Sequence, residues 1–372
     1  MTAADAARKK GVIDLALGDP DLDTDSRVIQ AAFADATAGH THYAPARGDN
    51  ELCATICDVW AADYGITIHD QELMITTSGC HAMWLLLTAT IDPKDEVIVF
   101  TPCFAPYFEQ IELAGGTVVE VPTLADQKFK PDAAAFEAAI TPKTKAVIVN
   151  SPCNPTATLL DENDISKLLS VCKRHDLLYI ADDIYTAYAF GGSFVAAATL
   201  PAAAERVATI HSFSKDFCMS GWRLGYVVAP PAVIDAMLSI NESNIYVAPT
   251  ISQRAACAAL SLRHDICAQV NTLYHNRMKY VAQRIEHIDY LDLPTCDGSL
   301  YAFIDIRKSG ETSESFVRKL LKKYQISTIA GCAFGIAGEG FIRMALRENT
   351  SVLTKVFDAL EHDEEWSSLT EN

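Results

Sequence analysis

The chain has 372 residues, of which 49% are hydrophobic, and its formal net charge is -18 at pH 7. A chain of this length can bury a large core, and we expect one large domain with a smaller one. Its acidity disfavours contact with nucleic-acid phosphates or an anionic membrane surface, so neither is expected as a partner. The longest apolar stretch, residues 82–91, is too short to span a bilayer.

Eleven cysteines are scattered through apolar segments. The closest pair, Cys53 and Cys57, lacks C-x-x-C spacing, and no Cys/His cluster has the spacing of zinc ligands. We therefore expect reduced, mostly buried thiols and no metal. The N-terminal stretch MTAADAARKKG lacks the apolar core of a signal peptide. These features together predict a cytoplasmic protein.

The central part of the chain alternates short apolar runs with helical patterns. Asp161 has the position of a helix N-cap before ENDISKLLSVCKRH, and residues 80–90 also have a helical pattern. The predicted strands are residues 73–76, 96–100, 145–150, 177–181, 207–211 and 224–229. Continuous apolar strands that alternate with helices predict an α/β fold, with a mostly parallel sheet covered on both faces.

The pattern changes from about Ile266, where a long helical stretch begins. Strand-like residues 299–306 and helical residues 314–324 follow, which is typical of a smaller α+β region. The N-terminal segment before Ala46 is a candidate to pack with it. We therefore expect a large domain over residues 46–270 and a small domain formed by residues 1–45 and 271–372.

Unusual polar residues follow four of the predicted strands. The four segments are TTSGC (76–80), NSPCNPT (150–156), ADDIY (181–185) and SFSK (212–215). Open α/β sheets bind ligands just beyond the carboxyl ends of their strands. One polar loop would mean little, but four in one chain predict a shared site.

The residue types in these loops suit one cofactor. The amine of Lys215 can form a Schiff base with an aldehyde. Ser212, Arg223 and the helix start at residues 78–80 could hold a phosphate. An aspartate could pair with a protonated pyridine nitrogen and keep the ring electron-withdrawing. These are the parts that pyridoxal phosphate needs.

At this point the stretch SFSKDFCMSGWRLGY, residues 212–226, closely resembles the signature of the class I/II pyridoxal-phosphate-dependent aminotransferases. The similarity runs from LALGDPDLDT (15–24) to GEGFIRMALRE (338–348). It implies the fold of aspartate aminotransferase, fold type I. In that fold, helices cover a mostly parallel sheet of the seven-stranded type, and a smaller α+β domain packs beside it.

The resemblance also implies roles around the cofactor. Lys215 would be the Schiff-base lysine and the acid/base that moves a proton between Cα and the C4′ carbon of the cofactor. Asp182 would pair with the pyridinium nitrogen, whereas Tyr185 and Asn154 would hydrogen-bond the ring phenolate oxygen. Phe104 would stack on the ring, although an ordinary core aromatic is an equally simple interpretation. The residues implied around the phosphate are Ser78, Gly79, Cys80, Ser212 and Arg223.

Two further roles concern the substrate and a partner. Arg343 lies in the apolar run GFIRMAL, where an unpaired buried arginine would be costly. It would grip the substrate α-carboxylate as a bidentate fork, with Gly18 and Asn154 nearby. Tyr43 would reach the phosphate of the neighbouring subunit, which implies a homodimer with shared active sites. A packing tyrosine is the alternative interpretation of Tyr43.

The first functional hypothesis is an aminotransferase of amino-acid metabolism, which moves an amino group from an L-amino acid to a 2-oxo acid. It would follow a ping-pong route through pyridoxamine phosphate. The alternative is a C–S β-lyase acting on cystathionine or cysteine conjugates, which shares the fold. A ligand-sensing transcription regulator is disfavoured because no segment is left for a DNA-binding module. A nicotinamide dehydrogenase is disfavoured because no G-x-G-x-x-G follows a strand.

The amino donor stays open at this level. Aromatic, alanine-type and methionine-type donors are all compatible with the motifs. An aspartate-type donor would need a second cation for its distal carboxylate, for which His40, His42 and Arg47 are candidates. Ala157 and Cys80 depart from the usual family pattern, which has glycine at the first position and often a hydroxyl residue at the second.

Overall fold

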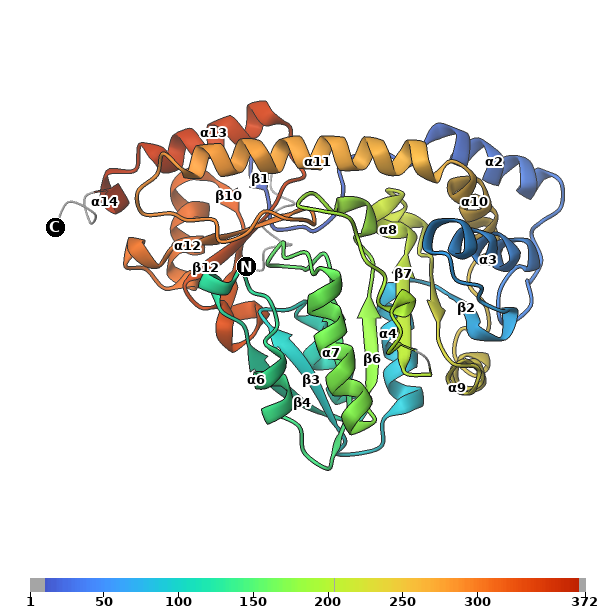
Figure 1. Cartoon of the computed structure of the whole chain (residues 1–372). Coiled ribbons are helices and arrows are strands. Elements are labelled where there is room, and N and C mark those ends of the chain that lie inside the picture. The colour runs from blue at the N-terminus through green and yellow to red at the C-terminus, as the bar shows by residue number, and fades with distance from the viewer. Residues whose placement is uncertain (1–10, 204, 368–372) are drawn as a thin grey trace.

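A seven-stranded sheet forms the centre of the computed structural model, which describes residues 11–203 and 205–367 (Figure 1). The strand order is β2-β8-β7-β6-β5-β3-β4. The strands are β2 (Leu73–Thr76), β3 (Glu96–Thr101), β4 (Thr117–Pro122), β5 (Thr144–Asn150), β6 (Leu178–Asp182), β7 (Val207–Ser212) and β8 (Gly225–Val228). Only β8 runs antiparallel to its neighbours, which confirms the mostly parallel sheet expected from the sequence.

Helices cover both faces of this sheet, which explains why its strands are continuous apolar runs. Along β3, Val97 and Val99 pack into one core, while Ile98 packs into another on the opposite face. The helices of this part are α3 (Asn50–Tyr64), α4 (Gly79–Thr90), α5 (Pro106–Leu113), α6 (Ala133–Ala138), α7 (Glu162–His175), α8 (Phe213–Asp216), α9 (Pro231–Glu242) and α10 (Thr250–Ser261). Asp161 caps α7 through the Asp164 N–H, as its position predicted.

The sequence patterns missed β4, which lies at one of the two edges of the sheet. Only Val121 is buried along it, so its residues carry no continuous apolar signal. Its neighbour β3 pairs with it in parallel along its whole length.

A smaller sheet lies in the C-terminal part of the chain. It has the order β11-β12-β9, with β11 (Ile329–Ala330), β12 (Phe341–Ala345) and β9 (Tyr301–Asp305). The helices of this part are α11 (Arg263–Ile285), α12 (Ser313–Tyr324), α13 (Thr350–Glu361) and α14 (Glu364–Ser367). Figure 1 shows α11 running along the top of the molecule, from the side of α13 to the side of α10.

The N-terminal segment contacts both parts of the molecule. Strand β1 (Ile13–Asp14) pairs in parallel with β10 (Ile326–Ser327), so it joins the C-terminal elements. Helix α2 (Ser26–Thr37) instead packs against α10. Short 3-10 helices complete the connections: η1 (Asp70–Glu72), η2 (Ala125–Gln127), η3 (Thr186–Tyr188), η4 (Ala197–Thr199), η5 (Ser220–Trp222), η6 (Arg307–Ser309), η7 (Gly331–Phe334) and η8 (Ile336–Gly338).

The structure bears on two of the expectations drawn from composition. None of the described helices is both long enough and apolar enough to cross a bilayer. The eleven cysteines are free, but only Cys53, Cys103 and Cys172 are buried, so the expectation of mostly buried thiols was wrong. Five others are half-buried, and four of these pack against the edges of the cores: Cys57, Cys218, Cys257 and Cys267. An apolar neighbourhood in the sequence thus led to partial burial for these thiols.

Candidate active site

Lys215 lies in the short helix α8, directly after β7. The segment that carries it folds back on itself, because Ser212 at the end of β7 is paired with Gly225 at the start of β8. The Ser212 hydroxyl accepts the Ser214 N–H at 3.2 Å and so caps α8. Lys215 is half-buried, and its Nζ donates a hydrogen bond to the carbonyl oxygen of Gly18.

The start of α4 packs tightly against the ends of β7 and β8. A Cβ on Gly79 would lie 3.5 Å from Ser212 Cβ, and one on Gly225 would lie 2.9 Å from the Gly79 nitrogen. Backbone N–H groups at a helix start surrounded by small residues suit a phosphate. The Ser78 hydroxyl caps this helix by accepting the His81 N–H at 3.1 Å.

Cys80 connects this helix start with the charged residues of the site. Burial raises the pKa of its thiol, and Asp182 raises it further, whereas Arg223 and Lys215 lower it. All three charges therefore act on the Cys80 thiol. Arg223 is exposed and donates to the Ser220 carbonyl oxygen at 2.7 Å. The Ser212 hydroxyl donates to the carbonyl oxygen of Leu224, the residue after Arg223, at 3.4 Å. The five residues expected around the phosphate therefore lie on segments that contact one another near Lys215.

Asp182 is a buried carboxylate at the carboxyl end of β6. The hydroxyl of Tyr107 donates to its Oδ2, while Oδ1 has no hydrogen-bond partner among the described residues. Burial raises the pKa of Asp182 to about 6, although the Tyr107 hydrogen bond opposes the rise. A buried carboxylate oxygen without a partner fits a protonated ring nitrogen.

Asn150 holds Asp182 and Asn154 in fixed positions. It pairs with Asp182 across β5 and β6, and its Nδ2 donates to the Asp182 carbonyl oxygen at 2.7 Å. Its Oδ1 accepts the Asn154 N–H at 2.8 Å. The side chain of Asn154 in turn accepts a hydrogen bond from Arg343 Nη1 at 3.0 Å. One network of hydrogen bonds therefore runs from Asp182 to Arg343.

Arg343 is a buried cation on β12. Its Nη2 donates to the Ala16 carbonyl oxygen, but its Nε has no partner, and no carboxylate lies within ion-pair distance in the described part of the chain. Its guanidinium carbon lies 4.4 Å from the ring centroid of Tyr301 and 5.1 Å from that of Phe334. Burial lowers the pKa of Arg343. A buried guanidinium with a free N–H is suited to a carboxylate ligand.

Tyr301 connects Arg343 with the opposite side of the site. Its hydroxyl lies 3.1 Å from that of Tyr185, a buried residue whose pKa is raised mainly by burial. A Cβ on Gly18 would overlap the Tyr301 hydroxyl, so a glycine is needed at this position. Tyr185, Gly18 and Arg343 therefore lie around a single tyrosine ring.

The remaining expected residues lie in different surroundings. Phe104 precedes α5 and makes an edge-to-face contact with Tyr107, with centroids 5.5 Å apart. Tyr43 is 83% exposed, and its ring contacts Tyr246 instead of the residues around Lys215. Arg47 donates to the carbonyl oxygens of Asp70, Gln71 and Leu73, so it is anchored beside β2.

A cleft of about 760 Å³ lies beside Arg223. Its walls are residues 19–24, η5 and the side chain of Arg347. Among the described residues, no three His, Cys, Asp or Glu side chains are placed to hold a metal ion.

Comparison with known proteins decides the family. Residues 10–360 match the family described as Aminotransferase class I and II. A putative aminotransferase of Bacillus subtilis is 35% identical over 91% of this chain and 88% of its own length. The chain belongs to the class I and II aminotransferases.

Solved structures of aminotransferases have the same fold. An aromatic aminotransferase from Pyrococcus horikoshii has a TM-score of 0.94 and 32% identity, over 99% of this chain and all of that one. An aspartate aminotransferase from Thermus thermophilus, solved with maleate, has a TM-score of 0.91 and 30% identity, over 96% and 94% of the two chains. The expected fold and enzyme class are therefore confirmed. The names of these relatives favour transamination over the lyase alternative.

Sequence reasoning missed three residues of this aminotransferase that organise the site: Tyr107, Asn150 and Tyr301. Asn150 lies in the segment NSPCNPT, but its position at a strand end would only have marked it as one of two asparagines. Tyr107 and Tyr301 belong to apolar stretches, where a tyrosine has the pattern of a core residue. No local signal identifies the carboxylate or the arginine that each of them contacts.

Proposed function

We propose that this aminotransferase binds pyridoxal 5′-phosphate over the carboxyl ends of β5, β6 and β7. The observation that carries the proposal is the pair of buried polar atoms without partners, Asp182 Oδ1 and Arg343 Nε. They lie at opposite ends of one hydrogen-bond network, beside the half-buried amine of Lys215. Buried polar groups in folded proteins are nearly always satisfied, so two such atoms at one site support a bound ligand.

The proposed cofactor contacts follow from these positions. Asp182 would hold the pyridinium nitrogen through Oδ1, while Tyr107 keeps Oδ2 in place. A cation against this carboxylate would also favour its ionised form, which burial alone disfavours. Asn154 and Tyr185 would donate to the ring phenolate oxygen, and Phe104 would cover one ring face. The residues proposed around the phosphate are Ser78, Gly79, Cys80, Ser212 and Arg223.

Lys215 would do the acid–base chemistry. When bound, pyridoxal phosphate supplies an aldehyde for the amine and a ring that withdraws electrons from the substrate Cα. Lys215 Nζ would hold the proton that leaves Cα and deliver it to the C4′ carbon of the cofactor. The Gly18 carbonyl oxygen, which accepts a hydrogen bond from Nζ, would limit the directions in which the amine can move.

Arg343 would bind the α-carboxylate of the substrate. An amino acid and a 2-oxo acid share this carboxylate, so one guanidinium would serve both half-reactions of a ping-pong cycle. Its contacts to Asn154 and Ala16 orient the fork before substrate arrives. Preorganised bidentate contacts stabilise a bound carboxylate without a further ordering cost.

The proposed assembly is a homodimer in which Tyr43 reaches the phosphate of the neighbouring subunit. The exposure of Tyr43 and its distance from its own Lys215 network support this assignment.

We also propose a large domain over residues 46–270 and a small domain from 1–45 and 271–372. Leu15 packs in one core with Leu300 and Phe357, which supports the assignment of the N-terminal strand. Eleven free cysteines support a cytoplasmic location.

The test is an absorbance titration of the cofactor-loaded protein with single L-amino acids. Bleaching of the yellow colour with release of the matching 2-oxo acid is the expected result. Aspartate, an aromatic amino acid, alanine and methionine would be compared to define the amino donor. Release of ammonia and pyruvate would support the β-lyase alternative instead. A protein that stays colourless with added pyridoxal phosphate would contradict the proposed cofactor site.

A further inference from the structure

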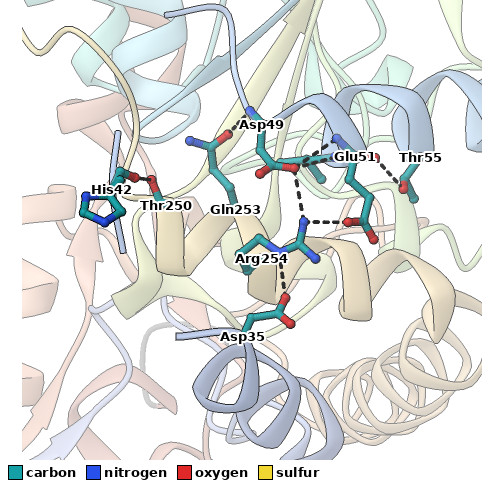
Figure 2. A network of polar contacts seen from close by, with 9 residues as sticks. Asp35, His42, Asp49, Glu51, Thr55, Thr250, Gln253 and Arg254 are labelled. Carbon is teal, nitrogen blue, oxygen red and sulfur yellow. Dashed lines mark hydrogen bonds and ion pairs between the residues drawn. The ribbon is translucent and has the colours of Figure 1, made fainter. Parts of the chain in front are cut away.

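The loop between α2 and α3, residues 38–49, carries Tyr43 across the surface of the molecule. Every residue from Thr37 to Tyr43 is exposed, and only then does Ala44 turn inward. A long exposed loop usually has many conformations. Here, however, the loop is held at several points by the neighbouring helix α10 (Figure 2).

Three side chains from the first turns of α10 contact this loop and its flanks. Thr250 Oγ1 donates to the His42 carbonyl oxygen at 2.7 Å, next to Tyr43. Gln253 Oε1 accepts the Asp49 N–H at 2.7 Å, at the far end of the loop. Arg254 is the third, and positions i, i+3 and i+4 place all of them on one face of the helix. We call Thr250, Gln253 and Arg254 the α10 clamp.

Arg254 connects α2 with α3, the two helices that the loop links. Its Nε donates to Asp35 in the last turn of α2 at 2.6 Å, and its Nη1 donates to Glu51 in the first turn of α3 at 2.7 Å. A longer contact of 3.3 Å reaches Asp49, the N-cap of α3. Figure 2 shows the guanidinium between these carboxylates.

Arg254 is the buried member of these ion pairs, whereas the side chains of Asp35 and Glu51 are 31% and 64% exposed. The Arg254 side chain is only 9% exposed. Burial lowers its pKa, but the hydrogen bonds that it donates to Glu51 and Asp35 outweigh this effect and raise the pKa overall. Without the guanidinium, three carboxylates from α2 and α3 would face one another with no cation between them. Their repulsion would separate the two ends of the loop.

The side chain of Tyr43 is exposed on this loop, whose backbone is held by the α10 clamp. Tyr43 makes an edge-to-face contact with Tyr246, with centroids 5.4 Å apart, and Tyr246 is itself 44% exposed. Ile245 beside it is 40% exposed. An exposed tyrosine on a preorganised loop, next to other exposed apolar groups, has the properties of an interface anchor.

We propose that the α10 clamp holds the loop in the conformation in which Tyr43 enters the active site of a second copy of this chain. The inference rests on the proposed function, which assigns Tyr43 to the phosphate of the neighbouring subunit. Arg254 is then a positioning residue for a site that is not in its own subunit. Loss of the clamp would weaken cofactor binding in the partner and leave the residues of its own site in place.

A mixed dimer tests this assignment directly. Two differently tagged chains, Arg254→Gln and Lys215→Ala, are co-expressed and the heterodimer is isolated through both tags. The Arg254→Gln homodimer should bind pyridoxal phosphate about tenfold more weakly, because both loops are displaced. In the heterodimer the Lys215→Ala chain supplies an intact loop to the intact site of its partner. About half of the wild-type activity and the wild-type cofactor affinity should therefore return at that one site.

A merely structural role would not give this rescue, because the damage would stay in the chain that carries the substitution. Wild-type cofactor affinity in the Arg254→Gln homodimer, or no recovery in the heterodimer, would overturn the inference. If Arg254→Gln does not fold, Thr250→Val replaces it in the same mixture, since it removes only the contact to His42. Activity and cofactor affinity should again recover in the heterodimer with Lys215→Ala, and no recovery would overturn the inference.

Two controls separate this inference from the proposed function. A heterodimer of Tyr43→Ala with Lys215→Ala should also regain activity. If this heterodimer stays inactive, the assignment of Tyr43 to the partner subunit is contradicted. If it regains activity but the heterodimer of Arg254→Gln with Lys215→Ala does not, only the role of the clamp is overturned. Arg284→Gln is the matched control, because Arg284 is 16% exposed and also holds two carboxylates, Asp358 and Glu361. Its homodimer should keep the wild-type cofactor affinity.

Discussion

The guanidinium of Arg343 lies over the ring of Tyr301, 4.4 Å from its centroid, while the hydroxyl of the same ring lies 3.1 Å from Tyr185. One aromatic side chain therefore contacts both the group proposed to bind the substrate and a group proposed to bind the cofactor. A displacement of Tyr301 would affect both at once. This relationship makes the two halves of the site interdependent.

Arg343→Lys should impair the use of every substrate. A lysine retains the charge but not the planar fork, and it loses the contacts to Asn154 and Ala16. We expect kcat/KM to fall about 10- to 100-fold for amino donors and 2-oxo acids alike, as measured by steady-state kinetics of both half-reactions. Arg307→Lys, at an arginine whose side chain is 60% exposed, is the control and should be near wild type. Unchanged kcat/KM values for both the amino donor and the 2-oxo acid in Arg343→Lys would remove Arg343 from the substrate site.

Gly18→Ala should disturb the site through Tyr301. The added methyl group would overlap the Tyr301 hydroxyl, so the ring must move away from Tyr185 and Arg343. A fall in kcat/KM of about tenfold or more is expected. The double variant with Tyr301→Phe should recover part of this loss, because the overlapping oxygen is gone. Gly192→Ala should leave kcat/KM unchanged, because the nearest atom to the new Cβ would be 3.8 Å away. An equal loss in the single and double variants would contradict the steric explanation.

Asp182→Asn should stabilise the cofactor-free protein at neutral pH while lowering its activity. Burial raises the pKa of Asp182 from 3.8 to about 6, so the native state binds this proton more tightly than the unfolded state does. The stability that this group contributes is present at low pH and is lost as the pH rises through its native pKa, by about 3 kcal/mol in all. Asparagine carries no such charge. Its advantage in free energy of unfolding, measured with urea, should therefore shrink from pH 7.5 towards pH 4.5. An advantage that is independent of pH would be inconsistent with a buried carboxylate as its origin.

Lys215→Ala should abolish turnover and leave the fold intact. The substitution removes the amine that attacks the cofactor aldehyde and moves the proton, whereas α8 keeps its cap at Ser212. We expect no measurable transamination, no yellow colour and an unchanged circular dichroism spectrum. Transamination at the native rate in this variant would show that another group is the base.

Much of the large sheet could be predicted from the sequence because its strands are buried on both faces. A run such as residues 145–150 has a strong signal for that reason, and Asp161 marked the start of α7. Strand β4 is exposed at both ends and half-buried over residues 118–120, so it has no comparable signal. The polar loops at the strand ends predicted which residues the fold gathers near Lys215, and a charge in an apolar run marked Arg343, which is buried.

The remaining site residues could not be predicted, because their roles depend on partners far away in the chain. Tyr301 is one tyrosine in a buried strand until the fold brings Gly18 and Arg343 against it. Arg254 has the pattern of an ordinary solvated helix residue, yet it is buried between carboxylates of two other helices. Contacts between residues far apart in the chain produce no periodic pattern in the sequence.

The pairing of β1 with β10 also has a consequence for the order of folding. Strand β1 leaves the ribosome early, but its partners are Ile326 and Ser327, and Leu15 accepts a hydrogen bond from Ala345. The segment that carries Gly18 must therefore remain unpaired until nearly the whole chain has been synthesised. The large sheet needs no residue beyond β8 and can form much earlier. Co-translational folding should thus assemble the part of the proposed site that contains Lys215 and the start of α4 first, and the part that contains Gly18 and Arg343 last.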